Sequence, residues 1–226
     1  MAEELELPLE EGDSVQKITG VKKALFSHIS KAQQYVQGTT FMEVDLARVR
    51  ELRAVCKVSY TSYIVAAVAQ AVKQAPLINS QLAGDRIILK GKINLGVAVD
   101  NDGKLLVPVI KEADRYQVQE IDEKIREFRH KAQERKISPD DLSGATFSVT
   151  NSGVFGSAFF TPIISYPQSA ILGIAGIVDR PVVRDGEIVI RPMCTLCLSY
   201  DHRVVEGSVA VKFLADVRDR LQNFEL

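Results

Sequence analysis

Apolar residues recur along this chain at two spacings, one typical of helices and the other typical of strands. Residues 21–32 place apolar side chains at steps of three and four, and residues 63–75 do so over a broad face that ends at Pro76, which cannot continue a helix. Residues 118–135 and 208–222 show the same spacing. These four segments are predicted to be helices, and the broad apolar face of 63–75 predicts a buried one.

Shorter runs between these segments alternate with period two or are continuously apolar, as strands are. Residues 87–89 and 93–99 lead into Asn101-Asp102-Gly103, a turn that returns the chain along 105–110 and predicts an antiparallel hairpin. Further strands are predicted over 41–46, 145–150, 170–177, 187–191 and 193–200. The last two are expected to join at a tight turn at Pro192. Because strands and helices interleave, we predict an α/β fold with a mixed sheet covered by helices.

The composition is that of an ordinary folded chain, but one end carries a distinct charge. Apolar residues make up 46% and charged residues 25% of the 226 residues, which excludes a disordered or collagen-like chain. The net charge is −1, yet the first 13 residues hold six acidic side chains and no basic one. The rest carries 28 basic against 23 acidic residues, far from the basic stripe of a nucleic-acid-binding protein. We expect an acidic linker or arm over 1–13, one domain over 14–226, and no nucleic-acid partner.

Membrane, secretory and metal-binding signals are weak. No run approaches the roughly 20 apolar residues of a membrane span, and the acidic start lacks the features of a signal peptide. The three cysteines, Cys56, Cys194 and Cys197, are too few and odd in number for a disulfide framework. Cys194 and Cys197, three apart in a predicted strand, point to opposite faces and do not share a metal. We expect reduced thiols, no metal, no membrane partner, and a cytoplasmic location, or the mitochondrial matrix in a eukaryote.

Among the three histidines, His202 is best placed for chemistry. His28 and His130 fall inside predicted helices, whereas His202 lies between a strand and the last helix, where side chains are displayed into clefts. A neutral imidazole near pH 7 is a natural general base, and the adjacent Asp201 and Arg203 are partners that could fix its loop. On spacing alone, a structural histidine is an equal alternative.

A loop rich in glycine and serine, residues 151–157, follows the predicted strand 145–150. It lacks the lysine of a P-loop and the glycine spacing of a dinucleotide fingerprint, which excludes nucleotide hydrolysis. Thr150, just before this loop, is by itself an ordinary hydroxyl at the end of a strand.

Three stretches in the right order resemble one family. Residues 201–207 resemble its D-H-R-x-x-D-G motif, residues 147–153 with 160–164 and 170–173 its oxyanion strand and the segment after it, and residues 96–100 with 107–110 its hairpin. The chain is thereby similar to the catalytic domain of dihydrolipoamide acyltransferases, the E2 cores of 2-oxoacid dehydrogenase complexes. These share a fold with chloramphenicol acetyltransferase. The resemblance implies a two-layer α/β sandwich that acts as a trimer.

The resemblance also implies a chemistry, the transfer of an acyl group between coenzyme A and dihydrolipoamide by thioester exchange. His202 would remove the proton from the attacking thiol, since a thiol of pKa about 8.5 is mostly protonated at neutral pH. The hydroxyl of Thr150, where the family has Ser or Thr, would donate a hydrogen bond to the oxyanion. Asn151 and Gly153 are possible further members of the oxyanion loop.

The resemblance implies that the active site is shared within a trimer, with the histidine supplied by one chain and the hydroxyl by its neighbour. A monomer is then expected to be inactive. Trimers of the family assemble into a cage of about 24 or 60 copies, which is the further expectation here. The lipoyl group would come from a separate domain, because the chain shows no lipoyl or subunit-binding domain, and the E1 and E3 components of the complex are the remaining implied partners.

Two positions depart from the family pattern. Glu206 stands where the family has aspartate, and Lys22 stands where it has arginine. We expect them to form an ion pair that supports the catalytic loop, with a point charge in place of a guanidinium fork. Two other functions stay open, a coenzyme A dependent O-acetyltransferase of a small molecule and a non-catalytic scaffold core of the same complex. The 2-oxoacid is not indicated.

Overall fold

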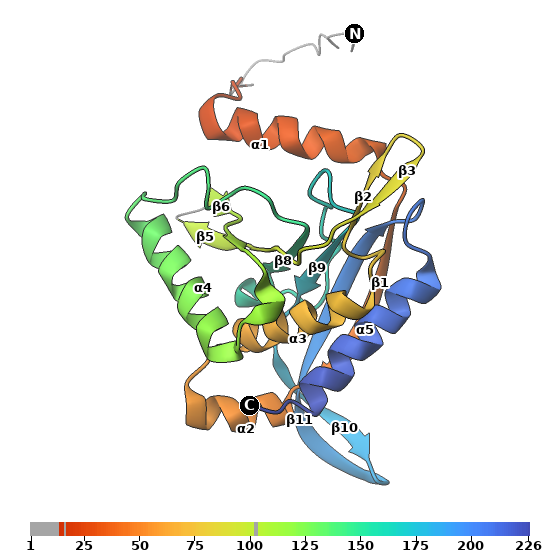
Figure 1. Ribbon diagram of the computed structural model, residues 1–226. Helices are drawn as coiled ribbons and strands as arrows, with labels where there is room; N and C mark the ends of the chain where they lie inside the picture. Colours follow the sequence, from red (N-terminus) through yellow and green to blue (C-terminus); the bar gives the residue numbers. More distant parts are fainter. Residues whose placement is uncertain (1–13, 16, 102–103) are drawn as a thin grey trace.

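The chain is seen in a computed structural model that describes residues 14–15, 17–101 and 104–226 (Figure 1). In this part of the chain, seven strands form one mixed sheet in the order β1-β11-β9-β8-β4-β7, with β10 paired to β11. The strands are β1 Gln37–Asp45, β4 Leu95–Val97, β7 Val109–Ile110, β8 Phe147–Asn151, β9 Ala170–Ile174, β10 Val178–Arg184 and β11 Glu187–Asp201. Strands β4, β8 and β9 run parallel, and the other pairs are antiparallel. The predicted mixed sheet is confirmed.

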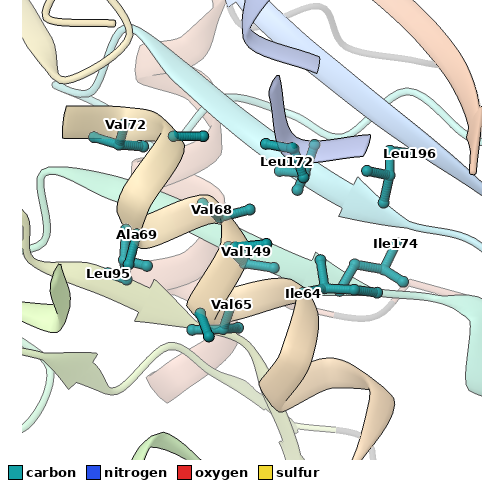
Figure 2. Close-up of a cluster of buried hydrophobic side chains, with 14 of the residues drawn as sticks. Ile64, Val65, Val68, Ala69, Val72, Leu95, Val149, Leu172, Ile174 and Leu196 are labelled. Atoms are coloured by element: carbon teal, nitrogen blue, oxygen red, sulfur yellow. The ribbon is translucent and has the colours of Figure 1, made fainter. Parts of the chain in front are cut away.

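Helices lie against this sheet, as predicted (Figure 1). The helices are α1 Gly20–Ser30, α2 Ala47–Cys56, α3 Tyr60–Gln74, α4 Val118–Gln133 and α5 Gly207–Gln222, with short 3-10 turns at Lys31–Gln34, Ala113–Arg115 and Gly153–Phe155. Helix α3 begins at its cap Ser59, whose side chain accepts a hydrogen bond from the Ser62 N–H, and Pro76 follows its end. Figure 2 shows α3 side chains beside buried residues of the sheet, among them Val149 and Leu172. The two-layer sandwich is therefore confirmed.

Alternation along β8 decides which side chains face the helices. Phe147 and Val149 are buried in the core, and the Phe147 ring meets Phe213 of α5 at a centroid distance of 5.9 Å. Since neighbouring residues of a strand point to opposite faces, Ser148 and Thr150 point to the face away from α5. Two hydroxyls are thus displayed on one side of β8, and the core lies on the other.

The predicted hairpin is present, but it is divided between two sheets. Strands β5 Val99–Asn101 and β6 Lys104–Leu106 pair as a separate ribbon, while β4 and β7 continue the hairpin in the main sheet. Positions 102 and 103 of the predicted turn lie outside the described residues, as does the predicted acidic arm over 1–13. A second ribbon joins β2 Ser80–Ala83 to β3 Arg86–Leu89.

The predicted turn at Pro192 is wrong, because β11 runs without interruption through that residue. Strand β11 pairs with β10 from Glu187 to Met193 and with β1 from Met193 to Asp201. The Pro192 carbonyl accepts a hydrogen bond from the Leu46 N–H at 2.8 Å. Proline is compatible with a strand where pairing changes from one neighbour to another, since the N–H it lacks is not needed for an unbroken ladder.

Neither a single membrane-spanning helix nor a cluster of metal ligands is present in the described ranges. No single helix there has the length and apolar character to cross a membrane, although the bent pair of α2 and α3 reaches both together. In the same ranges, no three His, Cys, Asp or Glu side chains gather in the manner of metal ligands.

Candidate active site

Thr150 lies near the end of β8, beside a cavity of about 370 Å³. It is half-buried, and its register partner on β9 is Gly173. A Cβ built on Gly173 would come within 2.5 Å of the Phe160 ring, so the glycine lets this ring lie close to the strand. Most of the cavity wall is apolar, with Leu25 and Ile29 contributed by α1. The hydroxyl of Thr150 is thus presented in a largely apolar setting.

The loop after Thr150 is held by hydrogen bonds from its own residues. The Asn151 side chain donates to Thr61 Oγ1 at 3.1 Å and accepts from the Gly153 N–H at 2.8 Å. A Cβ on Gly153 would lie 2.3 Å from the Ala175 carbonyl oxygen, so only glycine fits there. Asn151 and Gly153 therefore position the loop on α3, and the Gly153 N–H is engaged rather than free to meet an oxyanion.

Asp201 and Arg203 brace the loop that carries His202. The Asp201 carboxylate is fully buried and accepts hydrogen bonds from the Arg203 side chain, at 2.9 Å from Nε and 2.6 Å from Nη2, and from its backbone N–H at 3.1 Å. The hydrogen bond to Asp201 raises the pKa of the Arg203 guanidinium above its usual value. This paired, planar arrangement fixes the turn on both sides of His202.

The imidazole of His202 is exposed and packs beside an aromatic ring. Its centroid lies 5.5 Å from that of the Tyr200 ring, and the backbone N–H of His202 donates to the Val36 carbonyl at 2.8 Å. The Tyr200 ring in turn lies over Gly38, since a Cβ at that position would be 3.0 Å from Tyr200 Cζ. The exposed imidazole therefore rests on a supported ring rather than projecting freely.

Tyr35 closes the other side of the brace. The Arg203 guanidinium lies 5.9 Å from the centroid of its ring, and the Tyr35 hydroxyl donates to the Gln168 carbonyl at 2.9 Å. Burial, and then the charge of Asp201, raise the pKa of Tyr35 above its usual value, so the hydroxyl stays a neutral donor.

The supporting positions of Tyr35, Gly38 and Tyr200 were not predicted from the sequence. One signal was present, because a glycine inside a strand often marks a close approach. Gly38 is such a glycine, because β1 begins at Gln37.

The expected ion pair between Lys22 and Glu206 is not formed within one chain. Both side chains are exposed, and no ion pair joins them among the residues that the structure describes. Glu206 caps the start of α5 through its backbone carbonyl, and its carboxylate accepts no capping hydrogen bond. In this chain the ion pair of the loop is the one between Arg203 and the buried Asp201.

Strand register places Thr150 and His202 at different levels of the sheet. Thr150 pairs with Gly173 near the end of β9, whereas Tyr200 pairs with Ala170 and the Asp201 N–H donates to the Ser169 carbonyl before β9 begins. Continued to position 202, this register sets His202 level with position 168, about five residues from Gly173. Five residues span roughly 16 Å at 3.3 Å per residue. A single chain therefore does not bring the two groups together.

The comparisons with known proteins first define the class of fold. A solved chloramphenicol acetyltransferase superposes with a TM-score of 0.59 over 92% of this chain and all of that one, at 15% identity, which shows the shared fold alone. The family described as "2-oxoacid dehydrogenases acyltransferase (catalytic domain)" matches residues 10–226. The chain belongs to this family.

Named relatives differ in the acyl group that they carry. The succinyltransferase component of the 2-oxoglutarate dehydrogenase complex of Cupriavidus necator is 44% identical over 82% of this chain and 47% of its own. The lipoamide acyltransferase component of the branched-chain alpha-keto acid dehydrogenase complex of Bacillus subtilis is 41% identical over 95% and 53%. A solved probable dihydrolipoamide acetyltransferase from Listeria monocytogenes has a TM-score of 0.90 and 39% identity over 95% and 96%. The chain spans about half the length of the curated relatives it matches.

Proposed function

We propose that this chain transfers an acyl group between the thiols of coenzyme A and dihydrolipoamide. His202 accepts the proton of the attacking thiol, and the thiolate adds to the carbonyl carbon of the acyl thioester. The tetrahedral intermediate then expels the other thiol as a thiolate, which takes the proton back from the imidazolium. One thioester forms as another breaks, so the exchange needs no oxidant, reductant or metal.

The surroundings of the two groups support these roles. His202 is exposed on a turn that Asp201 and Arg203 hold, so an incoming thiol can reach the imidazole. Thr150 presents its hydroxyl beside an apolar cavity, where a hydrogen bond to a developing negative charge is stronger than in water. Such a donor contributes about 10²–10³ in rate, and a positioned general base about 10²–10⁴.

The separation of Thr150 from His202 along the sheet carries the proposal one step further. Because roughly 16 Å divides the two levels, the hydroxyl and the imidazole that act on one substrate are proposed to come from two copies of the chain. A closed trimer would repeat this contact at each interface. The solved cubic core of a pyruvate dehydrogenase complex, with a TM-score of 0.86 at 29% identity, supports further assembly into a cage. A lipoyl domain and the E1 and E3 components are the proposed partners.

Co-expression of His202→Ala with Thr150→Ala tests the shared site. Each variant alone is expected to lose about 10²-fold or more in rate. If the site lies between subunits, mixed trimers contain intact His and Thr pairs, and random assembly restores about a quarter of the wild-type sites. Activity that stays at the level of the single variants in isolated mixed trimers would contradict a site shared between chains.

A panel of acyl donors tests the reaction itself. Acetyl-, isobutyryl- and succinyl-coenzyme A are offered to free dihydrolipoamide, with His202→Ala as the control. Transfer from at least one donor, lost in the control, supports the proposal, and the ranking of donors indicates the 2-oxoacid complex. A folded oligomer that transfers none of them would contradict the enzyme and favour a scaffold.

A further inference from the structure

Ser148 is a second hydroxyl on the face of β8 that carries Thr150. The two residues are two positions apart, so their side chains share one face of the sheet, and both line the same cavity. Ser148 is 2% exposed, and its Oγ has no hydrogen-bond partner among the described residues. Because buried hydroxyls are nearly always paired, this side chain is suited to a partner that arrives with a ligand.

The strands on either side of β8 place a glycine and an isoleucine beside Ser148. On β4, its register partner is Gly96, and a Cβ there would lie 3.0 Å from Ser148 Oγ and 2.9 Å from Val107. On β9, its register partner is Ile171, which lines the cavity as well. The glycine therefore lets the Ser148 hydroxyl and Val107 pack closely over its Cα, and Ile171 gives the hydroxyl an apolar neighbour on the other strand.

Ser148 and Thr150 reach the cavity at two separate points of its wall. Two residues of a strand advance about 6.6 Å along its backbone. If Thr150 meets the thioester oxyanion, Ser148 is placed to meet a different atom of the substrate. That atom lies about 6.6 Å away in the direction of β8, which is the rise of two strand residues.

Burial indicates which part of the substrate comes to Ser148. Thr150 is half-buried and lies near the end of its strand, while Ser148 lies deeper. Coenzyme A and the lipoyl arm are long and must lead out of the site toward their bulky ends. Only the acyl group of a thioester substrate is short and has a free end, so it is the part that fits the depth of the cavity.

We propose that Ser148 selects among acyl groups and favours a chain that carries an oxygen at its far end, as the succinyl group does. This inference rests on the proposed acyl transfer. An acyl chain that ends in an oxygen supplies the hydroxyl with the partner it lacks, whereas an alkyl-ended group does not, and this one hydrogen bond corresponds to about tenfold in relative rate. No charged side chain lines the cavity within the described ranges, so the preference rests on hydrogen bonds rather than on an ion pair.

Ser148→Ala and the near-isosteric Ser148→Cys test the selection. The measurement is kcat/KM for succinyl- and isobutyryl-coenzyme A with dihydrolipoamide, together with the Tm of the ligand-free oligomer. We expect Ser148→Ala to lower the succinyl to isobutyryl ratio about tenfold, and Ser148→Cys to lower it less. The Tm should not fall, because the alanine removes a buried hydroxyl that has no partner within the chain.

Ser80→Ala is the matched control, since Ser80 is equally buried but its hydroxyl bonds Leu77 and Ser169 outside the cavity. It should lower the Tm and keep the donor ratio. An unchanged ratio in Ser148→Ala, or an equal loss with both donors, would overturn the inference while leaving acyl transfer intact. Transfer of acetyl alone would overturn this inference and leave the proposed function intact, whereas an oligomer that transfers none of the three acyl groups would contradict both.

Discussion

Gly38 lies directly beneath the ring of Tyr200, its register partner on β11. A Cβ at position 38 would be 3.0 Å from Tyr200 Cζ, and the same ring packs beside the His202 imidazole at 5.5 Å between centroids. The position of the proposed base therefore depends on a glycine more than 160 residues away in sequence. Contacts of this kind connect the first strand of the sheet with the chemistry at the end of its longest strand.

Gly38→Ala is expected to displace Tyr200 and with it His202. Inserting a methyl group into a filled space costs about 1–3 kcal/mol of stability, and kcat should fall about tenfold through the shifted imidazole. Thermal unfolding and acyl-transfer rates measure the two effects. The control is Gly91→Ala, where a Cβ would meet nothing within 4 Å, and it should leave both quantities near their wild-type values.

Loss of the Arg203 fork should destabilise the catalytic loop. Arg203→Met leaves the Asp201 carboxylate buried without its cation, which costs about 3–5 kcal/mol in a fully buried pair. Because the Arg203 side chain is 38% exposed, we expect about 2 kcal/mol by urea denaturation. Arg203→Lys should recover only part of this, since an ammonium cannot form the fork. A similar loss in Arg129→Met, an exposed arginine of α4, would contradict the assignment to the pair.

Asp122 should make stability depend on pH at the acidic end. Burial opposes its charge, but hydrogen bonds from the Ser62 hydroxyl at 2.6 Å and from Ser59 outweigh it and hold the pKa of Asp122 below its usual value. A carboxyl with a lowered folded pKa stabilises the fold above its unfolded pKa of about 3.9, and this contribution is lost as pH falls through the folded pKa. We expect Asp122→Asn to lower the Tm at pH 7 and to converge with wild type below about pH 4.

The matched control for this pH series is Asp140→Asn, because the Asp140 side chain is 83% exposed. Its Tm should follow that of wild type at every pH. A constant difference between Asp122→Asn and wild type across the acidic range would show that packing, rather than charge, is the contribution of Asp122.

The three thiols should differ sharply in reactivity toward an alkylating reagent. Burial raises the pKa of Cys194 to about 12 and raises that of Cys197 above its usual value, while Cys56 is only half-buried. Since the thiolate is the reactive form, Cys56 alone is expected to be alkylated in the native protein at pH 8, as read by mass spectrometry. All three should react in urea. Native labelling of Cys194 would contradict its place in the core.

Local pattern determined much of the fold. Helical spacing predicted α3, α4 and α5 close to their observed bounds, because each has an apolar face that its own residues define. The short helix α2 was not predicted, since only Val49 and Leu52 of its ten residues are buried. Proline misled at Pro192, where a local preference for turns was overridden by pairing with two successive neighbours.

The candidate site divides in the same way. The sequence by itself singled out His202 with Asp201 and Arg203 as neighbours between a strand and a helix, while the role predicted for Thr150 came through the family resemblance. Only the tertiary structure decided that His202 and Thr150 lie at different levels of the sheet and that Lys22 and Glu206 do not meet in one chain. The physical reason is register, since pairing between strands distant in sequence is fixed by packing across the whole sheet.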